Sequence, residues 1–371
     1  WRPGVMNGLT VKPLYSQAGF PENMALVNWA PGTYFHRHVH PGGEEILVLE
    51  RDLEPGGVCR SHREAGFTFD RTGHYLHLKD PEIERDLLGL LGDRLVRVSR
   101  NARIYCGGAW LDYPFQAHLH GLPREEVARC LIGFIEASRR TPPQPGPETC
   151  FEEWARGLFG DGIAEAFLLP YNRKLYRADL RQMTTEWVSW AVPRPSVEQV
   201  VRGALGVTNE GLGYNPSFYV PAAGGIDVIA RTLAGEVGSR LELGAEVAEV
   251  DAADRRVTLT DGRRFPYDAL ISTVPLPELL TRTRGLANGP RSGLAERLRA
   301  SAVVELQLGI PREGVGDGVH WIYVPEPRLP FYRVGMPSNV CPAMAPPGHS
   351  SLSVELSAPA GAPTPSAEDL L

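Results

Sequence analysis

Short apolar runs bounded by turn residues alternate along the chain with longer runs of helical periodicity. Residues 46–49 are apolar and end at the acidic Glu50, and residues 269–274, A-L-I-S-T-V, form a second, mostly apolar run. A strand that is apolar at every position needs cover on both faces, which is typical of an interior strand of a parallel sheet. We therefore predict that residues 46–49 and 270–274 lie in one parallel sheet, with Glu50 at its carboxyl edge.

Helical periodicity marks four further segments, at residues 80–95, 123–140, 151–169 and from 226 to 237. Strand patterns lie between and after them, at residues 96–104, 110–113, 241–250 and in several pieces from 302 to 355. Asp261 and Gly262 predict the tight turn of a hairpin. The alternation predicts an α/β fold, in which a parallel sheet is interrupted by a helical and β-sheet insertion.

Composition and charge narrow the class of protein. The chain has 371 residues, 43% of them apolar, so it can bury a large core in two or more domains. A net charge of −6 without long charged runs argues against nucleic acid or an anionic membrane as the main partner. No segment reaches the ~20 apolar residues of a membrane span. We expect a protein that acts on a small molecule.

The cysteines carry no chemistry of their own in the sequence. The five of them are scattered and never form a C-x-x-C pair, so neither a disulfide framework nor a zinc site is indicated; they are Cys59, Cys106, Cys130, Cys150 and Cys341. Reduced thiols are the default for such a pattern, and we expect a cytoplasmic location.

Candidate chemistry begins at Glu50. A carboxylate at the carboxyl edge of a parallel sheet suits a ribose diol. Gly56 and Gly57 allow a ligand to approach the backbone closely, and Arg60 and Ser61 offer a cation and a hydroxyl to a diphosphate. These residues are consistent with half of a dinucleotide site. The alternative is a Gly-Gly turn between two strands with a surface arginine, which a lone Gly-Gly pair would favour.

The string L-E-R-D-x-x-P-G-G-x-C-R-S, followed by G-F-x-F-D-x-x-G-H-x-L-H, resembles the second strand and following loop of a large flavoprotein family. That family holds the amine oxidases, protoporphyrinogen oxidase and the phytoene desaturases, and the Gly73-His74 ending is similar to the flavin-side histidine motif of UDP-galactopyranose mutases. The resemblance covers about residues 46–360 and implies FAD as cofactor. The implied cofactor-binding residues are Glu50, Gly56, Gly57, Arg60, Ser61, Gly73, His74 and Val247. The implied catalytic residues are His74, near the flavin ring, and Arg333, on the substrate face of the family sheet.

The same resemblance implies how residues 46–371 divide. The parts that bind the nucleotide in an FAD-binding, Rossmann-like sheet are residues 46–80 and 218–280, and the substrate domain takes residues 81–217 and 281–360. The segment from Tyr171 to Tyr176 is similar to the helical substrate domain of the mutases, which carry Y-T-x-K-x-W here. Asn172 and Tyr176 replace the Thr and Trp of that motif, so a UDP-sugar substrate is in question.

Residues 1–45 have a different character. Short strand patterns lead to A-P-G-T and then to His38, His40 and Glu44, a spacing that resembles the first motif of ChrR-type cupins. Two histidines at i and i+2 on a strand share one face, and with a nearby carboxylate they form a plausible three-ligand site for a divalent metal. The second cupin motif is not found, so the segment of about residues 1–49 resembles a truncated, all-β cupin, and its site is expected to be weak.

The flavoprotein pattern is incomplete as well. A strand and G-x-G-x-x-G are expected roughly 20 residues before Glu50, and residues 20–35 contain no such triplet; the final G-R-x-x-x-F/Y flavin segment is not found either. We expect that tight FAD binding is lost. Four functions stay open: an FAD-dependent oxidoreductase, a mutase-like flavin-dependent isomerase, a metal-binding cupin-type sensor, and an inactive chimeric product.

Overall fold

The structure is a computed structural model that describes residues 46–188, 192–207, 216–286, 293–363 and 365 in full. Of the N-terminal segment it describes the backbone of residues 2–3, 9–15 and 24–29. The chain divides into two compact units. Unit 1 holds residues 1–57, 79–87 and 229–299, and unit 2 holds residues 58–78, 88–228 and 300–371. Each unit is described by itself.

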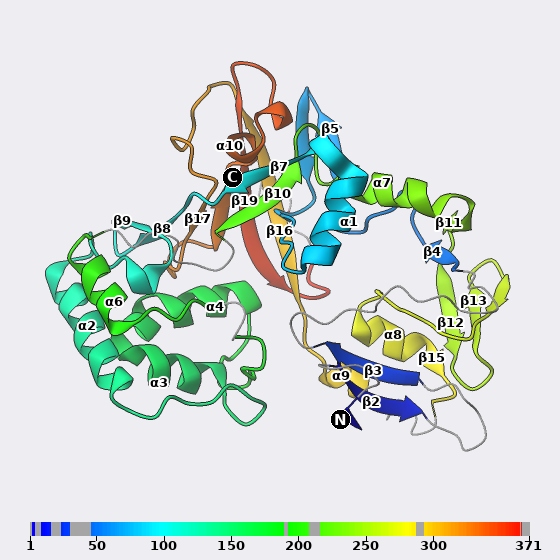
Figure 1. The fold of residues 1–371 in the computed structure, drawn as a ribbon, viewed down its shortest axis with the longest axis horizontal. Helices are drawn as coiled ribbons and strands as arrows, with labels where there is room; N and C mark the ends of the chain where they lie inside the picture. The colour runs from blue at the N-terminus through cyan, green and yellow to red at the C-terminus, as the bar shows by residue number, and fades with distance from the viewer. Residues whose placement is uncertain are drawn as a thin grey trace. The chain divides into compact units, whose positions relative to one another are not determined.

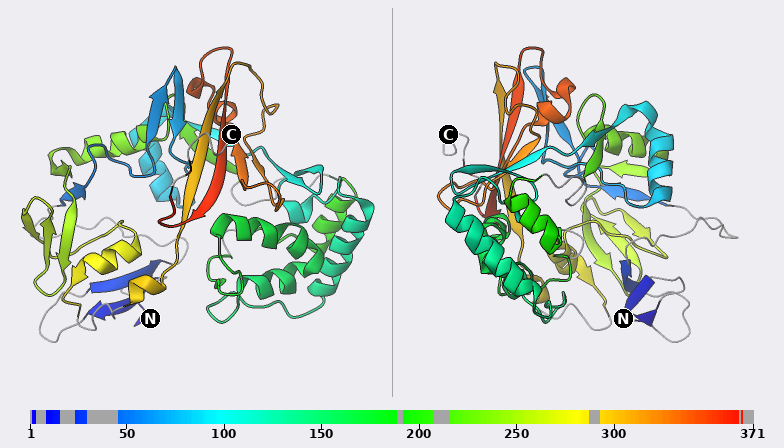
Figure 2. Two further views of the ribbon diagram at one scale, coloured as in Figure 1. Left: turned by 180° about the vertical axis from the view of Figure 1, so that it is seen from behind. Right: turned by 60° about the vertical axis from the view of Figure 1, so that its left-hand side comes forward.

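A six-stranded sheet is the centre of unit 2 (Figure 1). Its order is β16 (Ser301–Ile310), β19 (Ser350–Pro359), β18 (Arg333–Gly335), β17 (Trp321–Tyr323), β8 (Ala102–Cys106) and β9 (Ala109–Asp112). All neighbours are antiparallel except β17 and β8. Figure 2 shows the two long strands β16, in yellow-orange, and β19, in red, running side by side. The strands expected from 302 to 355 are confirmed.

A helical cluster forms a second core within unit 2. It consists of α2 (Arg124–Ser138), α3 (Phe151–Ile163), the π-helical turn η3 (Ala164–Leu168), α4 (Leu169–Tyr176) and α6 (Val197–Ala204). Phe151 and Trp154 are fully buried in it. Helices α2 and α3 approach closely where Gly160 faces Gly133. Gly160 has φ 75°, and a β-carbon there would overlap the Gly133 carbonyl, so this contact requires glycine. The expected helices 123–140 and 151–169 are confirmed.

Shorter elements complete unit 2. They are the hairpin β5 (Ser61–Glu64) and β6 (Phe67–Asp70), the antiparallel pair β7 (Leu95–Ser99) and β10 (Ser217–Pro221), the single-turn elements η1 (Gly92–Arg94), η2 (Phe115–Ala117) and η5 (Pro342–Met344), and the short helix α10 (Pro337–Val340). Helices α1 (Pro81–Leu91) and α7 (Asp227–Val237) contribute residues to both units.

Unit 1 is built from small sheets. The four-stranded sheet has the order β14 (Arg264–Pro266), β13 (Arg256–Leu259), β12 (Val247–Asp251) and β15 (Thr283–Arg284). Unit 1 also contains η4 (Gly238–Arg240), α8 (Leu276–Arg282), α9 (Leu294–Arg297) and an antiparallel sheet of β1 (Arg2–Pro3), β2 (Leu9–Tyr15) and β3 (Met24–Trp29). The hairpin predicted at Asp261-Gly262 is confirmed, with Gly262 at φ 88°.

The interior parallel sheet predicted from the apolar runs is wrong in its extent. Strand β4 (Val48–Glu50) pairs parallel with β11 (Leu241–Leu243), and these two strands form the whole of that sheet among the described residues. Residues 269–275 form no strand, and Ile271 is 93% exposed. A strand forms only where its backbone groups pair with a neighbouring strand, and residues 269–275 pair with no strand among the described residues, although β4 has a described partner on one side only.

Candidate functional site

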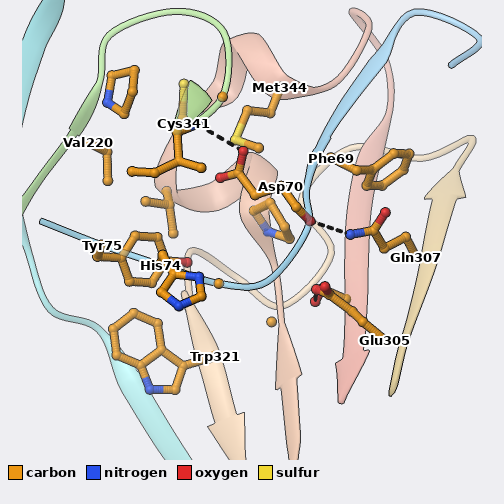
Figure 3. Close-up of a pocket in the computed structure, with 18 of the residues that line it drawn as sticks. Phe69, Asp70, His74, Tyr75, Val220, Glu305, Gln307, Trp321, Cys341 and Met344 are labelled. Atoms are coloured by element: carbon orange, nitrogen blue, oxygen red, sulfur yellow. Dashed lines mark hydrogen bonds between the residues drawn. The ribbon is translucent and has the colours of Figure 1, made fainter. Parts of the chain in front are cut away.

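A pocket in unit 2 lies against one face of the six-stranded sheet (Figure 3). The register of the strands determines which side chains of the sheet form the floor of the pocket. Glu305 of β16 lies directly opposite Glu355 of β19, and Glu355 lies opposite Arg333 of β18. Side chains in one row across a sheet share a face, so these three polar groups face the same side. The next row carries Gln307 and, across the sheet, Trp321.

Glu355 is the centre of a buried polar network. It is 2% exposed, and its two oxygens accept hydrogen bonds from different sides. The hydroxyl of Tyr332 donates to Oε2 at 2.7 Å, and Arg333 Nε donates to Oε1 at 2.8 Å. Burial disfavours the charged form of Arg333, but the Glu355 carboxylate outweighs it, so the pKa of Arg333 lies above its ordinary value. Arg333 therefore stays cationic and is held in one place.

Glu305 has a different environment from its cross-strand neighbour. Its Oε1 accepts a hydrogen bond from Ser353 Oγ, while its Oε2 is buried and has no hydrogen-bond partner among the described residues. Burial raises the pKa of Glu305 to about 7, and the nearby Glu355 carboxylate adds to the rise. This side chain can hold or release a proton near neutral pH.

The side of the pocket that faces the sheet is formed by the segment that follows β6. Gly73 approaches the sheet so closely that a β-carbon there would lie 3.3 Å from Arg333 Nη2. His74 lines the same pocket, and its Nδ1 is hydrogen-bonded to Thr72 Oγ1. Tyr75 stacks on Trp321 with ring centroids 5.3 Å apart, and burial raises the pKa of Tyr75 well above its usual range. Thus Gly73, His74 and Arg333, three of the residues that sequence reasoning selected, lie in one pocket.

Ser61 and Asp70 fix the loop that begins α7. Ser61 Oγ donates to Asp70 Oδ1 at 2.6 Å, and Asp70 Oδ1 also accepts from the Ile226 backbone N–H at 2.9 Å. The Asp227 N–H donates to Ser61 Oγ at 3.2 Å. Burial raises the pKa of Asp70 above its ordinary value, against these hydrogen bonds. Ser61 thus holds the start of α7, and its expected role at a diphosphate stays a prediction.

The other residues expected to hold the cofactor fall in two places. Arg60 is 7% exposed and belongs to unit 2, at the residue before β5. Glu50, Gly56, Gly57 and Val247 belong to unit 1. Glu50 ends β4 at the carboxyl edge of the parallel pair, as expected, and its Oε1 accepts a hydrogen bond from the Asp52 N–H at 2.9 Å. Their roles toward a cofactor stay predictions.

The glycine pair of unit 1 has a backbone conformation that few other residues adopt. Gly56 has φ 111° and Gly57 has φ 55°, both in the left-handed region that favours glycine. A β-carbon on Gly57 would meet nothing within 4 Å. The pair is therefore required by its conformation, and the space beside Gly57 is open.

Sequence reasoning missed three of the groups that define the pocket. They are Glu305, Glu355 and Trp321. The signal was present, because Glu305 and Glu355 interrupt apolar strand patterns, V-V-E-L-Q-L and S-V-E-L, at positions that share a face. What the pattern lacked was the register that places the two carboxylates opposite each other.

The cupin-type ligands His38, His40 and Glu44 lie outside the described residues, so their metal site stays a prediction. Within the described ranges no group of three His, Cys, Asp or Glu side chains is arranged to hold a metal ion. Among the helices of those same ranges, none is long and apolar enough to cross a bilayer.

Comparison with known families identifies the class of protein. Residues 40–371 match the family of flavin containing amine oxidoreductases, and residues 1–62 match the ChrR Cupin-like domain. The first match covers most of the chain, so the chain belongs to the flavin containing amine oxidoreductase family. The resemblances seen in the sequence, to a flavoprotein and to a cupin, are both confirmed.

Three solved structures are similar to this chain. The crystal structure of reduced UDP-galactopyranose mutase is 31% identical, with a TM-score of 0.77 over 85% of this chain and 70% of that chain. A structure assigned as a protoporphyrinogen oxidase from an Exiguobacterium species is 19% identical, with a TM-score of 0.59 over 84% and 71%. Putrescine oxidase bound to putrescine is 14% identical, with a TM-score of 0.52 over 85% and 71%. The last two show likeness of fold alone, and the mixed α/β fold is confirmed.

Proposed function

We propose that this chain is an FAD-dependent oxidoreductase that acts on a small molecule at the pocket of unit 2. One observation carries the proposal. Gly73, His74 and Arg333, assigned to the flavin and substrate sides from sequence motifs far apart in the chain, line a single pocket against the sheet. The family match supports flavin as the partner of that pocket.

The residues of the chain fit parts of FAD. In unit 1, Glu50 would bind the ribose, Gly56 and Gly57 would lie along the diphosphate, with open space beside Gly57, and Val247 would contact adenine. In unit 2, Gly73 and His74, the residues expected beside the flavin, line the pocket, and a β-carbon on Gly73 would lie 3.3 Å from Arg333 Nη2. When bound, FAD would supply the capacity to accept a hydride.

The side chains of the pocket have separate tasks. Glu355 and Tyr332 hold the Arg333 guanidinium in position, so a negatively polarised atom of the substrate would meet a fixed cation. The stacked rings of Tyr75 and Trp321 give an apolar wall that excludes water. Glu305 would accept or return a proton, since its pKa of about 7 matches neutral conditions.

A mutase-like isomerase is the second candidate, favoured by the 31% identity and TM-score of 0.77 to reduced UDP-galactopyranose mutase. The segment that resembles the mutase substrate domain is helical here. Tyr171 packs edge-on against Tyr323, with ring centroids 5.4 Å apart, and Asn172 donates to the Leu168 carbonyl at 2.7 Å. Asn172 is thus engaged within its own helix.

Anaerobic mixing of the chain with excess FAD and a set of amines would test the first candidate. Bleaching of the visible absorbance of oxidised flavin, lost in Arg333→Met and kept in Glu136→Gln on the exposed face of α2, supports an oxidoreductase. Conversion of UDP-galactopyranose to its furanose form only after chemical reduction of the flavin supports the mutase. If neither reaction exceeds free FAD, both candidates fail.

A further inference from the structure

Strand β16 is one edge of the six-stranded sheet, and it is long for an edge strand. It runs from Ser301 to Ile310 and pairs with β19 on one side, and no described strand pairs with its other side. None of its ten residues is buried, and Val303 is 45% exposed. A strand of this length spans about 33 Å, whereas most strands have about five or six residues. The outer side of β16 is therefore a long, accessible edge.

The register shows which backbone groups point outward from this edge. The Glu355 carbonyl accepts a hydrogen bond from the Tyr332 N–H, so the backbone groups of Glu355 point away from β16. In an antiparallel pair, the residue directly opposite then also points its N–H and C=O away, and that residue is Glu305. The same holds for every second residue of the strand. In the part of the chain that the structure describes, no backbone group hydrogen-bonds to this outward set, which is Val303, Glu305, Gln307 and Gly309.

The usual protections of a sheet edge are missing from β16. Edges are protected against pairing with another chain by short length, charged side chains, proline or a bulge. The opposite edge, β9, has four residues, and its Asp112 forms an ion pair with Arg103 at 3.6 Å. Strand β16 has no lysine, arginine or proline, and its pairing with β19 runs without a register shift. Its charged residue, Glu305, is turned toward the pocket (Figure 3).

The side chains of β16 form two rows of different character. Glu305 and Gln307 face the pocket, whereas Val304, Leu306 and Leu308 face the other side of the sheet and are partly exposed. A strand that pairs with this edge must therefore bring polar side chains on one face and apolar side chains on the other. A second copy of β16 meets both conditions.

The charge of Glu305 restricts the register between two copies. Directly opposite Glu305 of the second copy, it would place two carboxylates side by side, which is unfavourable. A shift of one strand by two residues places Glu305 opposite Gln307 of the second copy and keeps the outward backbone groups face to face. On the other face Leu306 then meets Leu306, and Val304 meets Leu308. About eight backbone hydrogen bonds would join the two edges.

We propose that this protein forms a two-fold symmetric dimer by antiparallel pairing of β16 with β16 of a second copy, with Leu306 at the axis. The two six-stranded sheets become one continuous sheet, and the two pockets lie on the same face of it. The contact is independent of flavin and substrate, so it goes beyond the function proposed above. A single pair of strands buries less area than a standard interface, and we expect a Kd of about 10 µM.

Sedimentation velocity of the full chain, over concentrations from about 1 to about 200 µM, tests the dimer. The wild type should pass from the mass of one chain to the mass of two. Val303→Lys places a charge on the edge and should raise the Kd about tenfold or more. The matched control is Val96→Lys, at a valine of β7 that is 40% exposed, and it should dimerise like the wild type.

Cross-linking tests the register. In Leu306→Cys the two thiols lie opposite each other at the axis, with β-carbons about 4.5–5.5 Å apart, close enough for a disulfide after a small adjustment. Mild oxidation should therefore link two chains. Leu308→Cys lies on the same face but away from the axis, and it should cross-link no more than the wild type, whose own cysteines give the background.

Three results would overturn the proposal. One is a wild type that stays monomeric at about 200 µM. Another is equal dimerisation of Val303→Lys and Val96→Lys, because a different surface would then join the copies. The third is cross-linking of Leu306→Cys no stronger than that of Leu308→Cys. If Val303→Lys fails to fold, the two cysteine variants decide, because they place no charge on the strand.

Discussion

Arg333 and Glu355 form a buried ion pair across β18 and β19, with Arg333 Nη2 2.6 Å from Glu355 Oε1. The Glu355 side chain is 3% exposed and that of Arg333 is 23% exposed. Both residues also line the pocket, so a change to either one should alter the stability of the sheet and the shape of the pocket.

Removing one partner of this pair should destabilise unit 2. In Arg333→Met the buried Glu355 side chain keeps, among the described residues, only the Tyr332 hydroxyl as a donor, and an uncompensated buried charge costs about 3 kcal/mol or more. Urea unfolding would measure the loss. The double variant Arg333→Met with Glu355→Gln should recover part of it, because the charge is then removed. A double variant as unstable as the sum of the single changes would contradict this account.

Glycine positions give a sharper test of local packing. A β-carbon on Gly225 would overlap Ser61 Oγ and Asp70 Oδ1, so Gly225→Ala should cost about 2 kcal/mol or more and loosen the start of α7. The matched control is Gly235→Ala within α7, where a β-carbon meets nothing within 4 Å. That change should stabilise by about 0.5–1 kcal/mol. Equal melting temperatures for the two variants would show that the contacts of Ser61 and Asp70 yield easily.

The sequence predicted the elements of unit 2 well, for a physical reason. Strands such as β16 and helices such as α2 show their own periodicity of apolar residues in the sequence. Gly73 and His74 belong to a motif that is recognised from the order of its residues alone. The pairing of Glu305 with Glu355 depends on register between strands about fifty residues apart, which no local pattern contains.

The same limit explains the failure at residues 270–274. Apolar composition marks residues 270–274 as a candidate strand, but a strand forms only where another segment pairs with it. Here no strand forms, and Ile271 is 93% exposed. Contacts made through the fold are a second limit. The role of Ser61 at a diphosphate stays a prediction, and the sequence does not show that its hydroxyl also accepts the Asp227 N–H.

The stability of the chain should depend on pH through Glu305. Its pKa is about 7 when folded and about 4.5 when unfolded, so the folded state binds more protons between these values. Stability should therefore fall as pH rises from about 4.5 to about 7, by up to about 3 kcal/mol. Chemical unfolding at several pH values would show the slope. Glu305→Gln should reduce the slope and leave the smaller part that belongs to Asp70, whose pKa burial also raises, whereas Glu136→Gln should leave it unchanged. A slope in Glu305→Gln equal to that of the wild type would contradict the assignment to Glu305.

The expected affinity for FAD depends on which of the family's cofactor contacts are present in this sequence. Glu50, Gly56, Gly57 and Val247 can serve the ribose, diphosphate and adenine, but residues 20–35 lack the G-x-G-x-x-G turn that offers a helix N-terminus to the pyrophosphate. Losing those backbone donors should remove on the order of 3 kcal/mol, about a hundredfold in affinity. We therefore expect the purified chain to be colourless and added FAD to bind with a Kd of about micromolar or weaker.

Absorbance of the purified chain and a fluorescence titration with FAD would measure this. The variant Glu50→Gln should weaken the residual binding further, because it removes the carboxylate expected at the ribose, while Glu136→Gln should not. Co-purification of one FAD per chain would contradict the prediction. It would mean that another part of the chain supplies the pyrophosphate contacts, and the flavin-dependent reactions proposed for the pocket could then be assayed without added cofactor.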